Sequence, residues 1–449
     1  MSLLSLDKSD RLKLNMKRFQ FLSIFKTGFK GGLVMKKMLV VLLVILGFVL
    51  LISASERGAV GQAKKEPIKI GLLVEKTGGL AAYGYSHERV MAAAVKKVNQ
   101  EGGIAGRPVE LYVEDSESKP SVGTLKFRKL VETNGVDFVF NSNSSGIAIA
   151  CNPIAKELKT PYFPCSSASE ISGEKGNRYV FQSCTNVTQE CKGGAEFALK
   201  YLGKKWVTVV VNYAWGWSNE IEFTKYITEK GGKVLKSIRV PLGTGDWLPY
   251  LKGNIPAEAE AVYFANFGSD FLSFSRDLHA VRPDIKRLGA VYAISAQDPK
   301  KLGIEGEGLY CITSYPTRLE GLNTKYNKDF RNLIGVDPDG KEIGTGKYFV
   351  LAYDWAVWQP FFSLKAAIEK SGWKGRADTP KVIKTLEGMA FKESLEFPQG
   401  NVSIRAQDHL AITGLYIEQI QKGELRVVAT IPAKEAMYPP TVDYTKEPF

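Results

Sequence analysis

Histidine is scarce in this sequence, and the motifs that mark common enzyme classes are missing. The chain of 449 residues has three histidines, His87, His279 and His409, which lie far apart. It contains no His-Glu-x-x-His zinc motif, no Gly-x-Ser-x-Gly nucleophile motif and no phosphate loop ending in Lys-Ser or Lys-Thr. These absences argue against the hydrolases, metalloenzymes and nucleotide-dependent enzymes that carry such motifs. We therefore expect neither catalysis, nor a metal site, nor a cofactor.

Cysteine is also sparse, and no two cysteines have Cys-x-x-Cys spacing. The five are Cys151, Cys165, Cys184, Cys191 and Cys311. Their spacing gives little support to a metal or redox function. In an exported protein they could form up to two disulfides with one thiol left over. Buried free thiols are the alternative, and the sequence leaves both open.

The sequence has no basic stripe with interleaved aromatic residues of the kind that nucleic-acid binders show. The formal net charge is +13, but residues 1–63 hold 10 Lys and Arg against 3 Asp and Glu. The remaining chain then has 50 basic and 44 acidic residues, a net charge of +6, scattered along its length. Such scatter indicates a solvated surface, and we expect no nucleic-acid partner.

The apolar run at residues 38–52 is too short for a membrane anchor. It has 15 residues, whereas a transmembrane helix needs about 20. Lys36 and Lys37 precede it, and small residues at 53–55 and 61–63 follow it. This order is typical of a cleaved secretory signal. We predict a leader at residues 1–63, with the signal and the true start codon near residue 35, and export from the cytoplasm.

Strands and helices alternate along the rest of the chain in two successive arrays. The first array predicts strands at residues 68–74, 109–113, 136–140 and 161–163, with helices around 91–98, at 120–132 and from 145. The second predicts strands at residues 206–211, 233–240, 261–264 and 288–293, with helices at 219–229, 271–280, 347–370 and 379–389. Strands separated by helices of this length form parallel sheets. We predict an α/β fold with two doubly wound lobes.

Short extended segments near residues 179–184 and 309–315 are expected to cross between the lobes. Together with a third crossing near His409 they would form a three-strand hinge. We predict lobe 1 at residues 66–182 and 313–414, and lobe 2 at residues 183–312 and 415–449. The ligand cleft is expected between them.

Two serine-rich loops follow neighbouring strands of the first array. Asn-Ser-Asn-Ser-Ser at residues 141–145 leaves the third strand, and Cys-Ser-Ser-Ala-Ser at 165–169 leaves the fourth. Carboxyl ends of parallel strands lie side by side, so we expect the two loops to converge. Ser144 as N-cap and Ser145 as first helical residue would add hydroxyls to the positive end of a helix. The interpretation is a site for a carboxylate or similar head, and simple helix capping is the alternative.

Several motifs give the chain a family resemblance over residues 66–449. They are Ile-Lys-Ile-Gly at 68–71, Thr-Gly at 77–78, Ala-Tyr-Gly at 82–84, Asn-Gln-Glu-Gly-Gly-Ile-Ala-Gly-Arg-Pro at 99–108, Glu-Asp at 114–115 and Arg-Ala-Gln-Asp-His at 405–409. With these the chain resembles the periplasmic solute-binding proteins of branched-chain amino acid ABC transporters. The resemblance implies the type I bilobal fold, a small-molecule ligand, permease subunits as partners and a monomer.

The resemblance also carries over ligand-binding positions. The implied site consists of Ser144 and Ser167 on the ligand's polar head, the backbone of Cys165 beside them, Tyr83 in the first lobe, and Trp215 and Phe267 in the second. Ser145 supplies the further hydroxyl described above. In the scheme that the resemblance implies, the ligand binds lobe 1 first and the lobes then close over it.

The chain departs from the resemblance where amino-acid binders hold the α-ammonium. They place an acid after the strand that corresponds to residues 288–291, but residues 289–293 read Gly-Ala-Val-Tyr-Ala. An unpaired buried ammonium costs on the order of several kcal/mol. Unless Asp270 or another acid substitutes, we expect a carboxylate or amide without an ammonium. A quaternary ammonium held against Trp215 and Tyr292 by cation–π contact is the alternative.

The sequence thus predicts an extracytoplasmic binding protein that delivers a small polar-headed ligand to an ABC importer. The alternative is a freestanding ligand sensor of the same fold that partners a receptor or kinase. Neighbouring permease genes would favour import, and a neighbouring kinase gene would favour sensing.

Overall fold

The structure is a computed structural model that describes residues 65–318 and 325–449. One compact unit, Glu66–Phe449, holds the described elements. The predicted leader at residues 1–63 lies outside the described residues, so the signal stays a prediction. No helix within the described ranges is long and apolar enough to cross a membrane.

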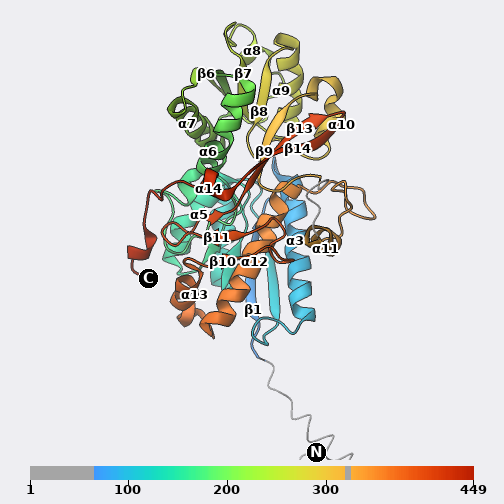
Figure 1. Ribbon diagram of the computed structural model, residues 1–449. Coiled ribbons are helices and arrows are strands. Elements are labelled where there is room, and N and C mark those ends of the chain that lie inside the picture. The colour runs from blue at the N-terminus through green and yellow to red at the C-terminus, as the bar shows by residue number, and fades with distance from the viewer. Residues whose placement is uncertain (1–64, 319–324) are drawn as a thin grey trace, which may run out of the picture. The chain divides into compact units, whose positions relative to one another are not determined.

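The first sheet is wholly parallel, and its strand order is β2-β1-β3-β4. Its strands are β1 (Ile68–Val74), β2 (Val109–Asp115), β3 (Phe138–Phe140) and β4 (Tyr162–Phe163). The accompanying helices are α3 (Ala81–Gln100), α4 (Pro120–Arg128), α5 (Ser145–Glu157), α11 (Lys325–Leu333), α12 (Leu351–Ser371) and α13 (Thr379–Leu386). Figure 1 shows α3 and α12 close together, and the two helices pack against each other. All four predicted strands of this array are present.

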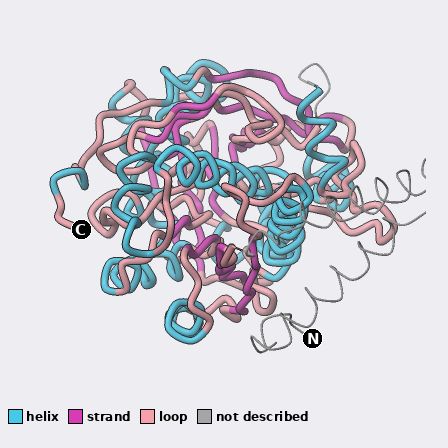
Figure 2. Tube along the Cα trace, turned by 90° about the horizontal axis from the view of Figure 1, so that it is seen from below, coloured by secondary structure: helices cyan, strands magenta, loops and turns pink. Residues whose placement is uncertain are grey.

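The second sheet has seven strands in the order β14-β13-β9-β8-β7-β5-β6. Five are mutually parallel: β5 (Lys205–Val211), β6 (Lys233–Val240), β7 (Ala261–Ala265), β8 (Lys286–Gly289) and β9 (Tyr310–Thr313). Two antiparallel strands, β13 (Leu415–Gln421) and β14 (Glu424–Ile431), complete one edge. Its helices are α6 (Val187–Phe197), α7 (Ala214–Glu229), α8 (Leu248–Leu251), α9 (Gly268–Val281), α10 (Asp298–Leu302) and α14 (Ala433–Ala436). Figure 2 shows helices flanking the strands.

Two features were not part of the predicted arrangement of two successive strand–helix arrays: a small antiparallel sheet, and contacts of the chain end with lobe 1. The small sheet consists of β10 (Ala390–Phe391), β11 (Val402–Ile404) and β12 (Ala411–Ile412). The prediction assigns residues 415–449 to lobe 2, yet the last residues contact lobe 1. The Tyr444 hydroxyl donates a hydrogen bond to the Gly173 carbonyl at 2.5 Å, and the Arg178 guanidinium lies over the Phe449 ring.

The predicted strand at residues 288–293 was wrong from residue 290 onward. Strand β8 ends at Gly289, and Tyr292 has a φ of 76°, in the left-handed region that interrupts extended backbone. Helix α7 also begins earlier than predicted, at Ala214, which places Trp215 in its first turn. Both differences turn residues at strand ends toward the space between the lobes.

Two glycines let helices pack directly on strand ends. A Cβ on Gly84 in α3 would lie 2.1 Å from the carbonyl oxygen of Glu75, the residue after β1. A Cβ on Gly216 in α7 would lie 1.9 Å from the last carbonyl oxygen of β5. Neither distance is compatible with a side chain. The preceding aromatic residues, Tyr83 and Trp215, are therefore held at the carboxyl end of the first strand of each sheet.

We expect Gly216→Ala to destabilise the protein by about 2 kcal/mol, because α7 must move away from β5. Gly146→Ala is the matched control in the first turn of α5. A Cβ there would come no closer than 3.6 Å to a neighbouring atom, and a gain of up to about 1 kcal/mol is expected. Urea unfolding measures both, and equal effects would contradict the packing argument.

Candidate functional site

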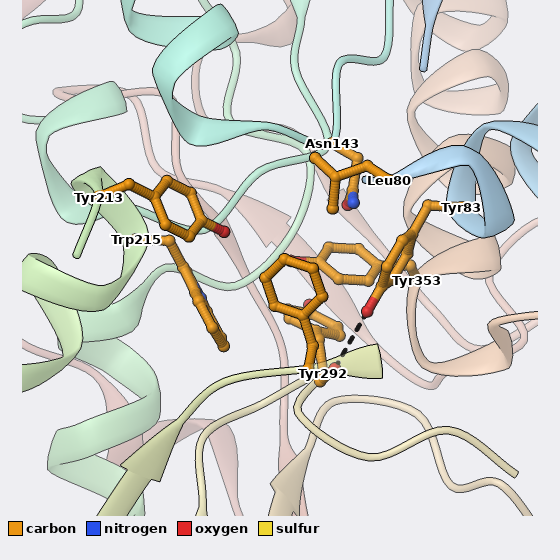
Figure 3. Close-up of a pocket in the computed structure, with 8 residues that line it drawn as sticks. Leu80, Tyr83, Asn143, Tyr213, Trp215, Tyr292 and Tyr353 are labelled. Carbon is orange, nitrogen blue, oxygen red and sulfur yellow. Dashed lines mark hydrogen bonds between the residues drawn. The ribbon is translucent and has the colours of Figure 1, made fainter. Parts of the chain in front are cut away.

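A pocket lies where the carboxyl ends of the strands of both sheets face each other (Figure 3). Its lining residues are Leu80, Tyr83, Asn143, Tyr213, Trp215, Phe267, Tyr292 and Tyr353. The non-atom space between them is ≈ 260 Å³ with open solvent included, but the enclosed room is only ≈ 20 Å³, enough for about one water molecule. The side chains themselves therefore nearly fill the pocket. The position agrees with the rule that open parallel sheets bind ligands beyond their strand ends.

Five helices begin at this pocket and place its side chains. Leu80, Tyr213 and Phe267 are the N-cap residues of α3, α7 and α9. Asn143 comes two residues before α5, and Tyr353 lies in the first turn of α12. Helix starts expose backbone N–H groups and a positive partial charge. The positive partial charge of these helix starts favours a polar ligand head at this end of the sheets.

The two lobes touch each other at the pocket through Tyr83. Its hydroxyl donates a hydrogen bond to the Tyr292 carbonyl oxygen at 3.2 Å. Its ring also meets Phe267 edge to face, with centroids 6.2 Å apart. Burial, with a smaller contribution from Asp298, raises the pKa of the Tyr83 hydroxyl, which keeps it a neutral donor. Tyr83 thus joins helix α3 to two segments of the second lobe.

Aromatic rings make up most of the pocket wall. Phe267 meets Trp215 and Tyr213 edge to face, at centroid distances of 5.8 Å and 6.4 Å. On the other side, Tyr353 meets Tyr83 edge to face at 5.7 Å and stacks on Tyr292. Such a wall suits a ligand with a flat or apolar body.

Tyr292 reaches from the pocket into the strands that cross between the lobes. Its hydroxyl lies 3.1 Å from Ser314 Oγ and 3.5 Å from Thr185 Oγ1, both buried. One ring face is covered by Tyr353. The side chain therefore couples the pocket wall to the crossing segments, with only part of its ring open to a ligand.

Two buried polar atoms on the pocket wall are available for a ligand. Asn143 is 8% exposed and Trp215 is 4% exposed. Among the described residues no group hydrogen-bonds Asn143 Oδ1 or Trp215 Nε1. One is an acceptor and the other a donor. The pocket wall therefore has one unpaired acceptor and one unpaired donor.

The two serine-rich loops converge as predicted and bond each other, and Asn143 is the residue of these loops that lines the pocket. The Ser166 hydroxyl donates to the Ser142 carbonyl at 2.6 Å, and the Ala168 N–H donates to Ser145 Oγ at 3.3 Å. The sequence-predicted residues Ser144, Ser145, Cys165 and Ser167 are all buried and absent from the lining residues. Those that do line it are Tyr83, Trp215, Phe267 and Tyr292.

A carboxylate from the protein itself binds the start of α5. Ser144 is the N-cap residue, as predicted, but its hydroxyl makes no capping bond. Instead, Glu75 Oε1 accepts from the N–H groups of Asn143 at 3.0 Å and Ser144 at 3.1 Å. Burial raises the pKa of the Glu75 carboxyl to about 7, against the lowering effect of these donors. Sequence reasoning missed this residue, although an acid directly after the apolar strand β1 was a usable signal.

The remaining missed residues are Leu80, Asn143, Tyr213 and Tyr353. Asn143 stands in the serine-rich loop 141–145, one position before Ser144, and Tyr213 lies two positions before Trp215. Tyr353 belongs to a long helix that is rich in aromatic residues, and no sequence pattern indicates which of them faces the pocket. Contact with α3 brings it there.

No acidic side chain is among the residues that line the pocket. Asp270, considered above as a partner for an ammonium, instead accepts a hydrogen bond from the Gly243 N–H at 2.8 Å. It therefore serves the loop after β6. The structure gives no carboxylate on the wall that would pair with the α-ammonium of an amino acid.

All five cysteines are buried free thiols. Burial raises the pKa of the Cys151, Cys165, Cys191 and Cys311 thiols, which keeps these four protonated and unreactive. Within the described part of the chain no group of three or more His, Cys, Asp or Glu side chains could hold a metal ion.

Asp354, beside Tyr353 in α12, gives a testable pH dependence. Burial raises the pKa of its carboxyl from 3.8 to about 7. A pKa raised by folding contributes stability at low pH that is lost as the pH rises through the folded value. We expect the advantage of Asp354→Asn over the wild type to grow by on the order of 2 kcal/mol between about pH 5 and pH 9.

Urea unfolding at the two pH values measures this difference. Asp284→Asn is the control, since Asp284 is 70% exposed and its partner Arg282 lowers its pKa. An Asp354→Asn effect of the same size at both pH values would contradict the assignment.

This chain is similar to known proteins both in sequence and in fold. A family model described as a periplasmic binding protein matches residues 67–424. The chain is 24% identical to Leu/Ile/Val-binding protein homolog 6 of Brucella melitensis over 372 residues, 82% of this chain and 90% of that protein. It is 25% identical to the Leu/Ile/Val-binding protein BraC3 of Rhizobium johnstonii over 334 residues, 74% and 85% of the two chains.

Solved structures share the fold at low sequence identity. A solute-binding protein of an ABC transporter from Rhodopseudomonas palustris, in complex with 3,4-dihydroxybenzoic acid, superposes with a TM-score of 0.71 at 21% identity, covering 82% of this chain and 98% of that chain. A leucine-binding protein from Thermotoga maritima gives 0.70 at 20% identity, covering 82% and 99%.

Proposed function

Because this chain belongs to the periplasmic binding protein family, we propose that it captures a small molecule between its lobes and delivers it to an ABC importer. Its relatives are transport binding proteins rather than enzymes, and such proteins bind small ligands and work with membrane permeases. The observation that carries the proposal is the pocket itself, whose walls come from both lobes.

Closure of the lobes is the proposed mechanism. A ligand first meets the wall of lobe 1, formed by Tyr83, Asn143 and Tyr353, and Trp215 and Phe267 then cover it. In the proposed closed state, the hydrogen bond from Tyr83 to the Tyr292 carbonyl and the edge contact of Tyr83 with Phe267 would hold the two lobes together. A ligand that binds the closed state better shifts the population toward it. A permease can then recognise the closed shape.

The family implies a periplasmic location. We propose that the leader predicted at residues 1–63 directs export and is cleaved. The buried, unbridged cysteines require no oxidising compartment for the fold, so the location rests on the family and the leader.

The ligand is proposed to have a small polar head and a flat or branched apolar body. Relatives are named for leucine, isoleucine and valine, and one structural neighbour holds 3,4-dihydroxybenzoic acid. The aromatic wall supports an apolar body, while the lack of an acid among the lining residues argues against a free α-ammonium. Ser144, Ser145, Cys165 and Ser167 are proposed to shape the loops behind Asn143.

The assignment of the pocket as the binding site is tested by removing one aromatic side chain from its wall. The ligand that co-purifies with the protein is identified by mass spectrometry after mild denaturation, and its affinity is then measured by calorimetry. Trp215→Ala is expected to weaken binding by at least about tenfold, because the ring contributes buried contact area.

Trp217→Ala is the matched control from the same helix. Trp217 is 39% exposed and its indole N–H donates to Asn212 outside the pocket, so its loss should change affinity by less than about twofold. Unchanged binding by Trp215→Ala would refute the pocket as the binding site.

A further inference from the structure

We propose that Glu75 excludes ligands with a carboxylate head and that the pocket selects an uncharged head that both donates and accepts hydrogen bonds, such as a carboxamide. This inference rests on the proposed function, since it specifies the ligand of the same pocket. Its basis is that the protein's own carboxylate fills the anion-binding start of α5.

The Glu75 carboxylate uses both oxygens at the start of α5. Oε1 accepts from the N–H groups of Asn143 and Ser144, and Oε2 lies 3.2 Å from the Asn143 N. The Ser142 hydroxyl lies 3.5 Å from Oε1. The side chain is fully buried. Two of the donors that could hold a ligand carboxylate at this helix start, the Asn143 and Ser144 N–H groups, are therefore already occupied.

A second carboxylate next to Asn143 would meet unfavourable charge. Two carboxylates that share one set of donors cannot both remain ionised without a large cost. The eight lining residues include no Lys or Arg to compensate. The charge of Glu75 also reaches the pocket wall: burial first, and then Tyr83 and Glu75, raise the pKa of the Tyr213 hydroxyl. Inside the lobe Glu75 likewise contributes to the raised pKa values of Cys151 and Tyr162.

The unpaired polar atoms of the pocket wall then determine which polar head group the ligand can have. Asn143 Oδ1 accepts a hydrogen bond and Trp215 Nε1–H donates one, and each residue is more than nine-tenths buried. A carboxylate only accepts and an ammonium only donates, so each would leave one of these atoms unpaired. A carboxamide does both. The aromatic rings around these atoms would flank its apolar body.

Matched ligand pairs test the selection. The purified protein is titrated calorimetrically with benzamide and benzoate, and with isobutyramide and isobutyrate, at about pH 8.5, where a carboxyl with a pKa of about 7 is ionised. We expect each amide to bind at least about tenfold more tightly than its acid. In Glu75→Gln, which keeps the shape without the charge, the acid should gain most of that difference. Equal binding of acid and amide by the wild type, or an unchanged preference in Glu75→Gln, would overturn the proposal.

A second experiment needs no knowledge of the natural ligand. Glu75→Ala frees the N–H groups of Asn143 and Ser144, so formate should raise the melting temperature of this variant and leave the wild type unchanged. Glu190→Ala is the control, because the Glu190 carboxylate accepts from the Thr185 hydroxyl rather than from a helix start. Formate stabilisation of all three proteins, or of none, would contradict a filled anion site.

The two proposals fail in different ways. If the protein carries no ligand and its lobes do not close, import is refuted while the formate result for Glu75→Ala stands. If Glu75→Ala does not fold, the paired titrations with Glu75→Gln decide the selection.

Discussion

Direct contact between helix starts and strand ends is the constraint on which the pocket depends. Gly84 and Gly216 allow it in the two lobes, since a Cβ at either position would collide with a carbonyl oxygen at or directly after a strand end. The aromatic residue before each glycine is then fixed at the carboxyl edge of its sheet. When two such edges face each other, their aromatic residues form opposite walls of one cavity, and contact between the walls joins the lobes. Binding and closure are thus consequences of the same packing.

The buried carboxylate of Glu75 connects the stability of lobe 1 to the chemistry of the pocket. It satisfies N–H groups at the start of α5 that would otherwise lack partners, so it stabilises the loop that presents Asn143. The same bonds remove those donors from a ligand. The relatives and structural neighbours described above are named for amino acids or hold an aromatic acid. On the proposed account, Glu75, which lies behind the pocket wall, is the one residue that changes which polar head group the ligand can have.

Regular periodic features could be predicted from the sequence, and tertiary contacts could not. Strands β1 and β6 match their predicted bounds, β1 as a largely apolar run and β6 as a run in which apolar and polar residues are mixed. The convergence of the serine loops followed from parallel sheet geometry alone. That most of their serines are buried, and that Glu75 accepts from N–H groups at the helix start, could not be predicted, since Glu75 is an isolated acid without a periodic pattern. Tyr353 reaches the pocket only because α12 packs on α3. The end of β8 was missed since nothing in the residue type of Tyr292 signals its left-handed backbone.

The central claim is that the two lobes close around a ligand held by the pocket walls. Pulsed electron paramagnetic resonance between spin labels at exposed Lys96 in α3 and Lys252 after α8 measures this directly. The account predicts a broad, longer distance distribution without ligand and a single shorter distance when the co-purified molecule is restored. The same distribution with and without that molecule would contradict it.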